Sequence, residues 1–228
     1  MTGYVRAAAL TARAKGERLG RASLLFASIL LAATFAVGPA ARPVAATEVA
    51  ATAYATPEQV VAAFHDALLQ AMRVGVYQTR YDDLAPAMNR AFDFASMTRI
   101  AIGPSWYNLQ TAQQDALVDA FRRFSIATYA SQFDQYSGER FEAAGPSEVA
   151  PQGMIVQTIL QPADGKPIKF NYLLHRAAGG WHIVDIYLEG TISQLAVRRS
   201  EFTSVLAQSG PDGLAHLLDQ KAKRLAMM

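Results

Sequence analysis

The apolar residues of this chain change their spacing twice, and this change limits the possible folds more than any other feature. Up to Gly138 they recur every three or four positions, which is the spacing of amphipathic helices. From Glu139 to Gly190 they recur every second position, which is typical of β-strands. After Gly190 the helical spacing returns. The chain is therefore expected to be an α+β domain in which N-terminal and C-terminal helices pack on a sheet.

Capping residues and helix breakers place the ends of the expected helices. The first begins after Thr56, an N-cap with Gln59 three residues later, and Gly75 closes it. Further helices are expected over residues 82–90, 92–103, 111–136, 192–210 and 211–225. Pro86 should delay or kink the first of these. The Ser-Gly-Pro sequence around Gly210 separates the last two.

The strands are expected over residues 139–144, 153–161, 167–176 and 181–190. Short turns containing Gly separate them, which predicts an antiparallel meander. Both faces of the last two strands are apolar. On one face, the third strand presents Ile168, Phe170, Tyr172 and Leu174, and the fourth presents Trp181, Ile183, Asp185 and Tyr187. Because a half-solvated sheet would alternate apolar and polar residues, apolar structure is expected to cover both sides.

The N-terminal segment has the order of a secretory signal. Basic residues precede an uncharged stretch rich in Leu, Ala and Phe, and small residues follow it. We expect a signal peptide over 1–46 with cleavage after Ala46 or Ala53, a linker over 47–55, and one domain over 56–228, exported to the periplasm. An uncleaved anchor is the alternative. However, the apolar run of about 15 residues before Gly38 is shorter than the roughly 20 that a spanning helix needs.

Composition and spacing remove several classes of function. The chain has no Cys, which excludes disulfide scaffolds and thiol catalysis. Six basic and two acidic residues precede Tyr54, which leaves 15 basic and 17 acidic residues after it, so nucleic acid is not an expected partner. His175 and His182 would face each other if Arg176 pairs with Trp181, but a third metal ligand is missing. Neither a metal, a cofactor nor a catalytic residue is expected.

Three functions remain in competition. The 19 aromatic residues from Tyr54 onward favour a protein that binds an apolar ligand. The first alternative is an NTF2-like isomerase or hydrolase that uses Asp185 with the hydroxyl of Tyr172 in a closed pocket. His182 does not complete such a site, because an offset of three in a strand places it on the opposite face from Asp185. The second alternative is an adaptor with a solid core and an exposed apolar patch.

Residues from Phe92 to about Lys221 resemble the MlaC-type family of periplasmic lipid-binding proteins, also called the toluene-tolerance family. The resemblance rests on "FDFASMTRIAIGPSWYNL", on "DAFRRFSIATYASQFDQY" and on "GGWHIVDIYLEGTISQLAVRRSEFTSVLAQSGPDGLAHLL". Within the family the chain is most similar to the HpnM-type branch associated with hopanoid biosynthesis. It departs from the commoner pattern at "EGTISQLAVRRSEF", where phospholipid carriers have Val-Ser and an aromatic residue before the Arg. This departure leaves phospholipid and hopanoid open as the cargo.

The resemblance implies a curved, cystatin/NTF2-like antiparallel meander wrapped by helices around an apolar cavity that buries lipid tails. It implies a carrier and not an enzyme. The carrier would move lipid between the inner and outer membranes and would work with an MCE-domain ABC transporter and an outer-membrane lipoprotein complex. The residues expected to line the cavity are Phe94, Met97, Ile100, Trp106, Phe121, Phe124, Tyr129, Phe133, Phe170, Tyr172, Ile183 and Tyr187. Structural roles are expected for Trp181 as a corner against the C-terminal helices, Asp185 and Arg199 as a buried ion pair, and Gly190 as the turn from strand to helix.

Overall fold

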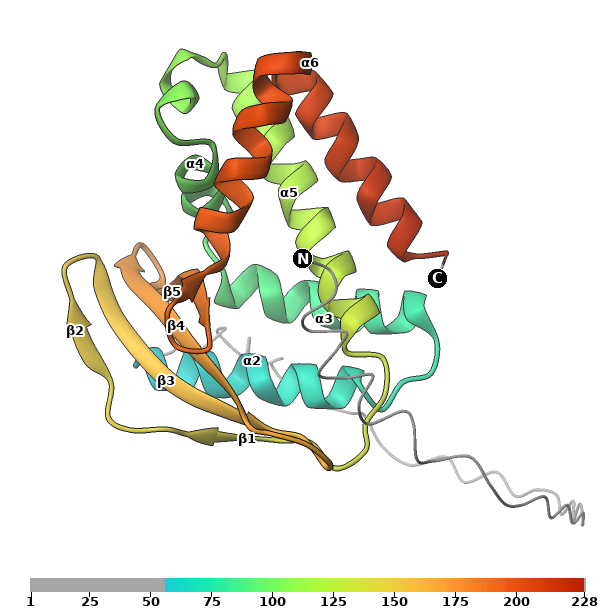
Figure 1. The fold of residues 1–228 in the computed structure, drawn as a ribbon, viewed down its shortest axis with the longest axis vertical. Helices are drawn as coiled ribbons and strands as arrows, with labels where there is room; N and C mark the ends of the chain where they lie inside the picture. Colours follow the sequence, from blue (N-terminus) through green and yellow to red (C-terminus); the bar gives the residue numbers. More distant parts are fainter. Residues whose placement is uncertain (1–55, 228) are drawn as a thin grey trace, which may run out of the picture.

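The computed structural model describes residues 56–227 (Figure 1). The expected signal peptide, its cleavage sites and the linker lie outside these residues. The elements, in chain order, are α2 (Pro57–Ala71), α3 (Tyr77–Ala91), α4 (Phe94–Ile102), the 3-10 helix η1 (Gly103–Asn108), α5 (Thr111–Gln132), β1 (Arg140–Ala143), β2 (Glu148–Ala150), β3 (Gly153–Gln161), β4 (Ile168–Ala177), β5 (Gly180–Leu188), β6 (Ile192–Ser193) and α6 (Gln194–Leu225). Helices before and after a sheet confirm the predicted α+β class.

One sheet and two groups of helices make up the fold. The sheet is antiparallel in the order β1-β3-β4-β5-β6, and β2 pairs with β3 beside β1. Helix α2 contacts β3 and β5, whereas α4 and the start of α6 contact β5. Helix α5 packs on α3, α4 and α6 (Figure 1). The short strands β2 and β6 were not predicted, because two or three residues are too few to show a spacing.

The helix ends show how far capping patterns predict structure. Thr56 and Gln59 form the expected capping box, although the helix ends at Ala71, before Gly75. Helix α3 begins five residues earlier than predicted and continues through Pro86. Pro86 and the residue four positions before it are both exposed, so water can reach the carbonyl that the proline leaves without a donor. The expected late start at Pro86 was therefore wrong.

Helix α5 begins at the predicted residue but is four residues shorter than predicted. Its N-cap is Gln110, whose backbone N–H donates to the side-chain oxygen of Gln113, and Thr111 is the first helical residue. The helix ends at Gln132 because Phe133 leaves the helical region of backbone angles. The four residues expected to continue the helix instead form the connection toward β1.

A β-bulge decides which side chains of β5 face the helices. Tyr172 of β4 pairs with Ile186 of β5. The register then shifts between Leu173 and Leu174, so that Leu174, which is on the same face of β4 as Tyr172, pairs with Ile183. The bulge therefore places Ile183 and Ile186 on the same face, although their offset is odd. Consequently the prediction that Ile183 shares a face with Asp185 and Tyr187 was wrong.

Helix α6 folds back on itself at the predicted break. Gly210 has φ 66° and ψ −176°, values that favour glycine, and Pro211 begins the second arm. The two arms run in different directions from this break (Figure 1). The turn from β5 toward α6 uses Gly190 at φ 77°, as expected, but Glu189 precedes it at φ 51° and β6 intervenes before the helix begins.

Candidate functional site

Aromatic rings form a continuous path through the interior of the protein. The path runs from β1 through α2 and α4 to α5 and α6, with neighbouring ring centroids 3.8–6.4 Å apart. Its members are Phe141, His65, Phe64, Phe92, Phe94, Phe121 and Phe202. A branch leads from Phe64 to Tyr129 and then to Phe133, whose ring stacks on that of Tyr129 at 5.6 Å. The phenylalanines and tyrosine of this path belong to the hydrophobic core of the described residues or pack against it.

Two polar side chains at the centre of this interior bond to each other. His65 Nε2 lies 2.9 Å from the hydroxyl oxygen of Tyr172, and the imidazole stacks on the ring of Phe141. Burial lowers the pKa of His65 to about 3, because the charged imidazolium would lose its hydration. His65 is therefore neutral at physiological pH. Sequence reasoning gave this residue no role, since its partner is 107 positions away.

A third polar group in the interior has no partner. The hydroxyl of Tyr129 forms no hydrogen bond within residues 56–227, and burial raises its pKa. Among the described residues, every fully enclosed polar side-chain atom has a hydrogen-bond partner. Tyr129 is half-buried, so its unpartnered hydroxyl is not fully enclosed. The Tyr129 side chain is therefore partly exposed at the edge of the apolar interior.

The structure distributes the twelve expected lining residues unevenly. Eight are buried: Phe94, Met97, Phe121, Phe124, Phe133, Phe170, Tyr172 and Ile183. Three are half-buried: Trp106, Tyr129 and Tyr187. Ile100 keeps 39% of its surface exposed, and Tyr187 pairs with Asn171 on the other face of the sheet from Tyr172. Ten residues thus belong to the core or pack against it, while Ile100 and Tyr187 do not belong to the core cluster.

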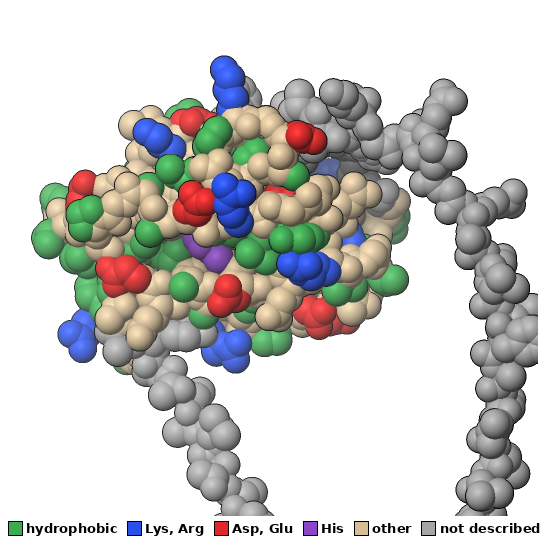
Figure 2. Space-filling view, turned by 90° about the horizontal axis from the view of Figure 1, so that it is seen from below, with side chains coloured by type: hydrophobic (Ala, Val, Ile, Leu, Met, Phe, Trp, Pro, Cys, Tyr) green, Lys and Arg blue, Asp and Glu red, His purple; other side chains and the backbone are tan. Residues whose placement is uncertain are grey.

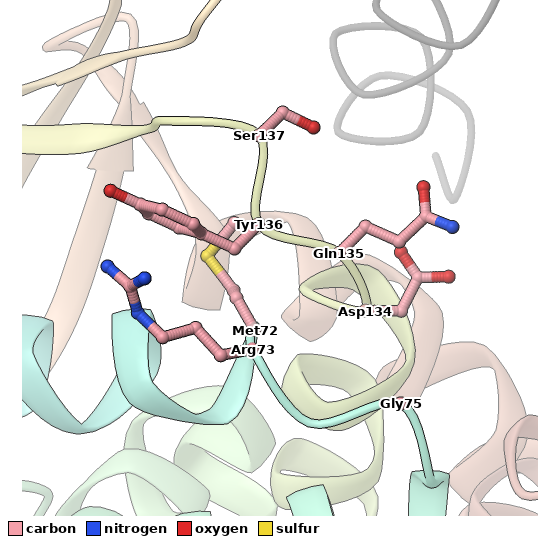
Figure 3. Close-up of a pocket in the computed structure, with 7 residues that line it drawn as sticks. All are labelled: Met72, Arg73, Gly75, Asp134, Gln135, Tyr136 and Ser137. Atoms are coloured by element: carbon pink, nitrogen blue, oxygen red, sulfur yellow. The ribbon is translucent and has the colours of Figure 1, made fainter. Parts of the chain in front are cut away.

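Two pockets are open at the surface, and none of the twelve residues lines either one. The first, of about 430 Å³, lies between the α2–α3 connection and the segment after α5 (Figure 3). The second, of about 280 Å³, lies between α3, α5 and the end of α6 and includes Tyr77, Tyr81 and Ala222. The expected apolar cavity is neither of these two pockets.

The paired residues of the enzyme alternative lie on opposite faces of the sheet. Tyr172 faces the aromatic interior, whereas Asp185 pairs with Leu173 on the other face. The Asp185 carboxylate accepts hydrogen bonds from the backbone N–H groups of Ile186 and Leu195 and from the hydroxyl of Ser193. Burial raises its pKa, and these hydrogen bonds oppose that shift. Asp185 thus ties the start of α6 to β5, and the two residues form no common site.

The bulge also corrects the expectation for the histidines. His182 and Asp185 share a face, but His182 Nδ1 bonds to the carbonyl of Arg90. His175 pairs with His182 in the predicted register, and its Nε2 lies 2.9 Å from a carboxylate oxygen of Asp93. His182 therefore attaches the end of α3 to the sheet, and His175 attaches the N-cap of α4. No group of three metal-ligating side chains occurs within residues 56–227.

Arg199 does not form the expected ion pair with Asp185. Its side chain lies over Gly103, where a Cβ would come within 2.5 Å of the guanidinium. The more buried neighbour, Arg198, lies over the ring of Phe124 at 4.9 Å and pairs with Glu201, which also binds Lys221. The prediction of an Asp185–Arg199 pair was wrong, because backbone N–H groups at the start of α6 already satisfy the carboxylate. Trp181 is half-buried at the β4–β5 turn and packs against the core.

The charges on the surface can be compared with the expectation that nucleic acid is not a partner. Lys, Arg, Asp and Glu side chains are interspersed on the face seen in Figure 2, and no field of one sign stands out there. Among the helices of residues 56–227, none combines the length and the apolar character that crossing a membrane requires.

Comparison with known proteins agrees with this architecture. A family model described as "MlaC protein" matches residues 58–220, which is well over half of the chain. The chain belongs to the MlaC family. The match does not distinguish the HpnM-type branch from the rest of the family. No curated protein matches this MlaC-family chain in a sequence search.

A solved structure shares the fold. It is described as the phospholipid-binding protein from Ralstonia solanacearum in complex with a phospholipid. The TM-score is 0.66 at 23% sequence identity, and the alignment covers 75% of this MlaC-family chain and 99% of the other. The likeness to this structure shows that the two chains share a fold.

Proposed function

We propose that this MlaC-family protein is a periplasmic lipid carrier that buries lipid tails between the sheet and the helices. The observation that carries the proposal is the family match together with a shared fold whose solved example holds a phospholipid. The physical motive is strong. At roughly 0.8 kcal/mol per CH₂, two acyl chains with about 30 carbons in total cost some 20–25 kcal/mol when exposed to water.

The interior supports this proposal through its chemistry. The aromatic path and its branch through Tyr129 present apolar surface from the sheet to α6, and the His65–Tyr172 pair is neutral and internally satisfied. An apolar chain that lies there meets no unpaired charge, so its burial carries no large desolvation cost. Because neighbouring rings contact one another, we expect tail binding to move α2 and α5 apart from the sheet.

The cargo, route and partners complete the proposal. The cargo is a phospholipid or a hopanoid-type polycyclic lipid. The N-terminal signal would deliver the protein to the periplasm. There it would carry lipid between the inner and outer membranes, in contact with an MCE-domain ABC transporter and an outer-membrane lipoprotein complex.

The decisive experiment is to purify the protein without detergent from the periplasm of a Gram-negative host that makes hopanoids. Extracted lipid is then identified by mass spectrometry. We expect about one lipid per protein, and its identity distinguishes the two cargoes. A preparation that contains no lipid and takes none from vesicles would contradict the proposal.

A second experiment locates the cargo. A phospholipid that carries a photoreactive group on its tail should form crosslinks within α5 and β4, near Phe133, Tyr129 and Phe170. Tyr187 and Ile100 serve as internal controls, because one lies on the other face of the sheet and the other is exposed. Crosslinks confined to these two residues would show that tails do not enter the interior.

A further inference from the structure

The second arm of α6, residues 211–225, is joined to the first through one non-helical residue. Gly210 has φ 66° and ψ −176°, and Pro211, which follows it, has no N–H to donate back into the first arm. A Cβ at Gly210 would meet no atom within 4 Å. The space around this residue is therefore open, and glycine accepts a wide range of backbone angles, which together are properties of a hinge.

Few apolar side chains hold the second arm in place. Leu214 and Leu218 are its only fully buried residues, and both belong to the hydrophobic core. Toward the end of the arm a pocket of about 280 Å³ separates Ala222 from Tyr77 and Tyr81 of α3. The arm thus closes part of the core, yet its last turns are not packed tightly against the neighbouring helix.

Two ion pairs fasten the second arm, one to α5 and one to the first arm. The Asp219 carboxylate accepts two hydrogen bonds from the Arg123 guanidinium of α5, at 2.9 and 3.2 Å. Lys221 binds Glu201 of the first arm. All four side chains are partly exposed, so water competes for both pairs, the latches, and each contributes little to stability. Contacts of this kind separate and form again at low cost.

From these observations we infer that the second arm is a gate over the apolar interior, which swings on Gly210 when the latches open. This inference rests on the proposed lipid-binding function and describes how the same interior is opened. The second arm lies along α5 (Figure 1), so its movement withdraws Leu214 and Leu218 from the core and uncovers apolar surface. A lipid tail that takes the place of the two leucines restores the apolar burial.

The first test staples the second arm to α5. The chain has no cysteine, so R123C/D219C can be joined by a short bismaleimide with a reducible spacer. Transfer of pyrene-labelled phosphatidylcholine is then followed between the protein and vesicles of phosphatidylethanolamine and phosphatidylglycerol. We expect the staple to slow transfer at least tenfold, and reduction of the spacer to restore the rate of the unstapled variant. The same staple in H216C/Q220C, an exposed pair within the arm, should leave the rate unchanged.

The second test follows the arm without any lipid. Hydrogen exchange measured by mass spectrometry compares the amides of residues 211–225 with those of residues 194–209, and the second arm should exchange faster. R123Q should raise its exchange and the rate of lipid transfer by about twofold to fivefold, the range expected for a partly exposed ion pair. R122Q is the matched control, because Arg122 pairs with Asp119 of its own helix and should change neither rate.

The outcomes separate this inference from the function on which it rests. If the wild type takes up the labelled lipid but the R123C/D219C staple does not slow transfer, the gate is wrong while lipid binding stands. Equal exchange of the two arms would also overturn the gate. If the wild type takes up no lipid from these vesicles and carries none when purified, the proposed function itself fails.

Discussion

His65 Nε2 and the hydroxyl of Tyr172 lie 2.9 Å apart at the centre of the apolar interior, joining α2 to β4. Y172F removes this hydrogen bond and leaves a buried imidazole nitrogen without a partner. We expect it to lower the free energy of unfolding by about 1–3 kcal/mol in urea titrations.

Y129F is the matched control, because it deletes a tyrosine hydroxyl that has no partner within residues 56–227. Its effect on stability should stay within about 0.5 kcal/mol. Equal destabilisation by the two variants would show that the His65–Tyr172 bond contributes nothing specific.

The lowered pKa of His65 predicts how stability depends on pH. The folded-state pKa is about 3, below the ordinary value of 6.5, so the unfolded chain binds this proton first. The contribution is fully present above pH 6.5 and is lost as the pH falls from there toward 3. At pH 5 the loss should be roughly 2 kcal/mol, since one pKa unit corresponds to about 1.4 kcal/mol.

The measurement compares the wild type with H65Q in urea titrations at pH 7.5, 6 and 5. H65Q should weaken the acid-dependent loss, whereas H216Q, at an exposed histidine, should reproduce the wild-type dependence. Parallel curves for the wild type and H65Q would contradict the assignment of a neutral, buried imidazole.

Gly103 is expected to tolerate no side chain, for two separable reasons. Its backbone has φ 71° and ψ −146°, a region that is essentially restricted to glycine, and a Cβ would meet the Arg199 guanidinium at 2.5 Å. G103A should cost about 2–4 kcal/mol of unfolding free energy. Adding R199A should recover only the steric part. If the double variant is as unstable as the sum of the two single variants, Arg199 does not pack on Gly103.

The buried Arg80 holds two segments together through its guanidinium. Its Nε donates to the carbonyl of Ala130 in α5 and its Nη1 to the carbonyl of Val74, both at 2.8 Å. R80M leaves both carbonyls without this donor, and we expect a loss of roughly 3 kcal/mol in thermal or urea unfolding. R90M changes an exposed arginine of the same helix and should have little effect. Similar losses for both variants would contradict this role.

Local patterns were sufficient to predict most of the elements. The Thr56–Gln59 capping box, the break at Gly210 and the register of His175 with His182 all appear as expected. Each depends on residues close in sequence or joined by a short turn, and their spacing directly sets the backbone hydrogen bonds. The α+β order follows for the same reason, because the period of the apolar residues matches the period of the backbone.

Tertiary packing decided the features that no local pattern encodes. The bulge beside Leu174 moved Ile183 to the helix side and separated Tyr172 from Asp185. The surroundings of His65 and Arg199 depend on residues about a hundred positions away, so their partners became apparent only when the helices met the sheet. Periodicity shows which residues avoid water. Which of them touch is decided by how the elements pack, since that depends on the shape of every side chain between them.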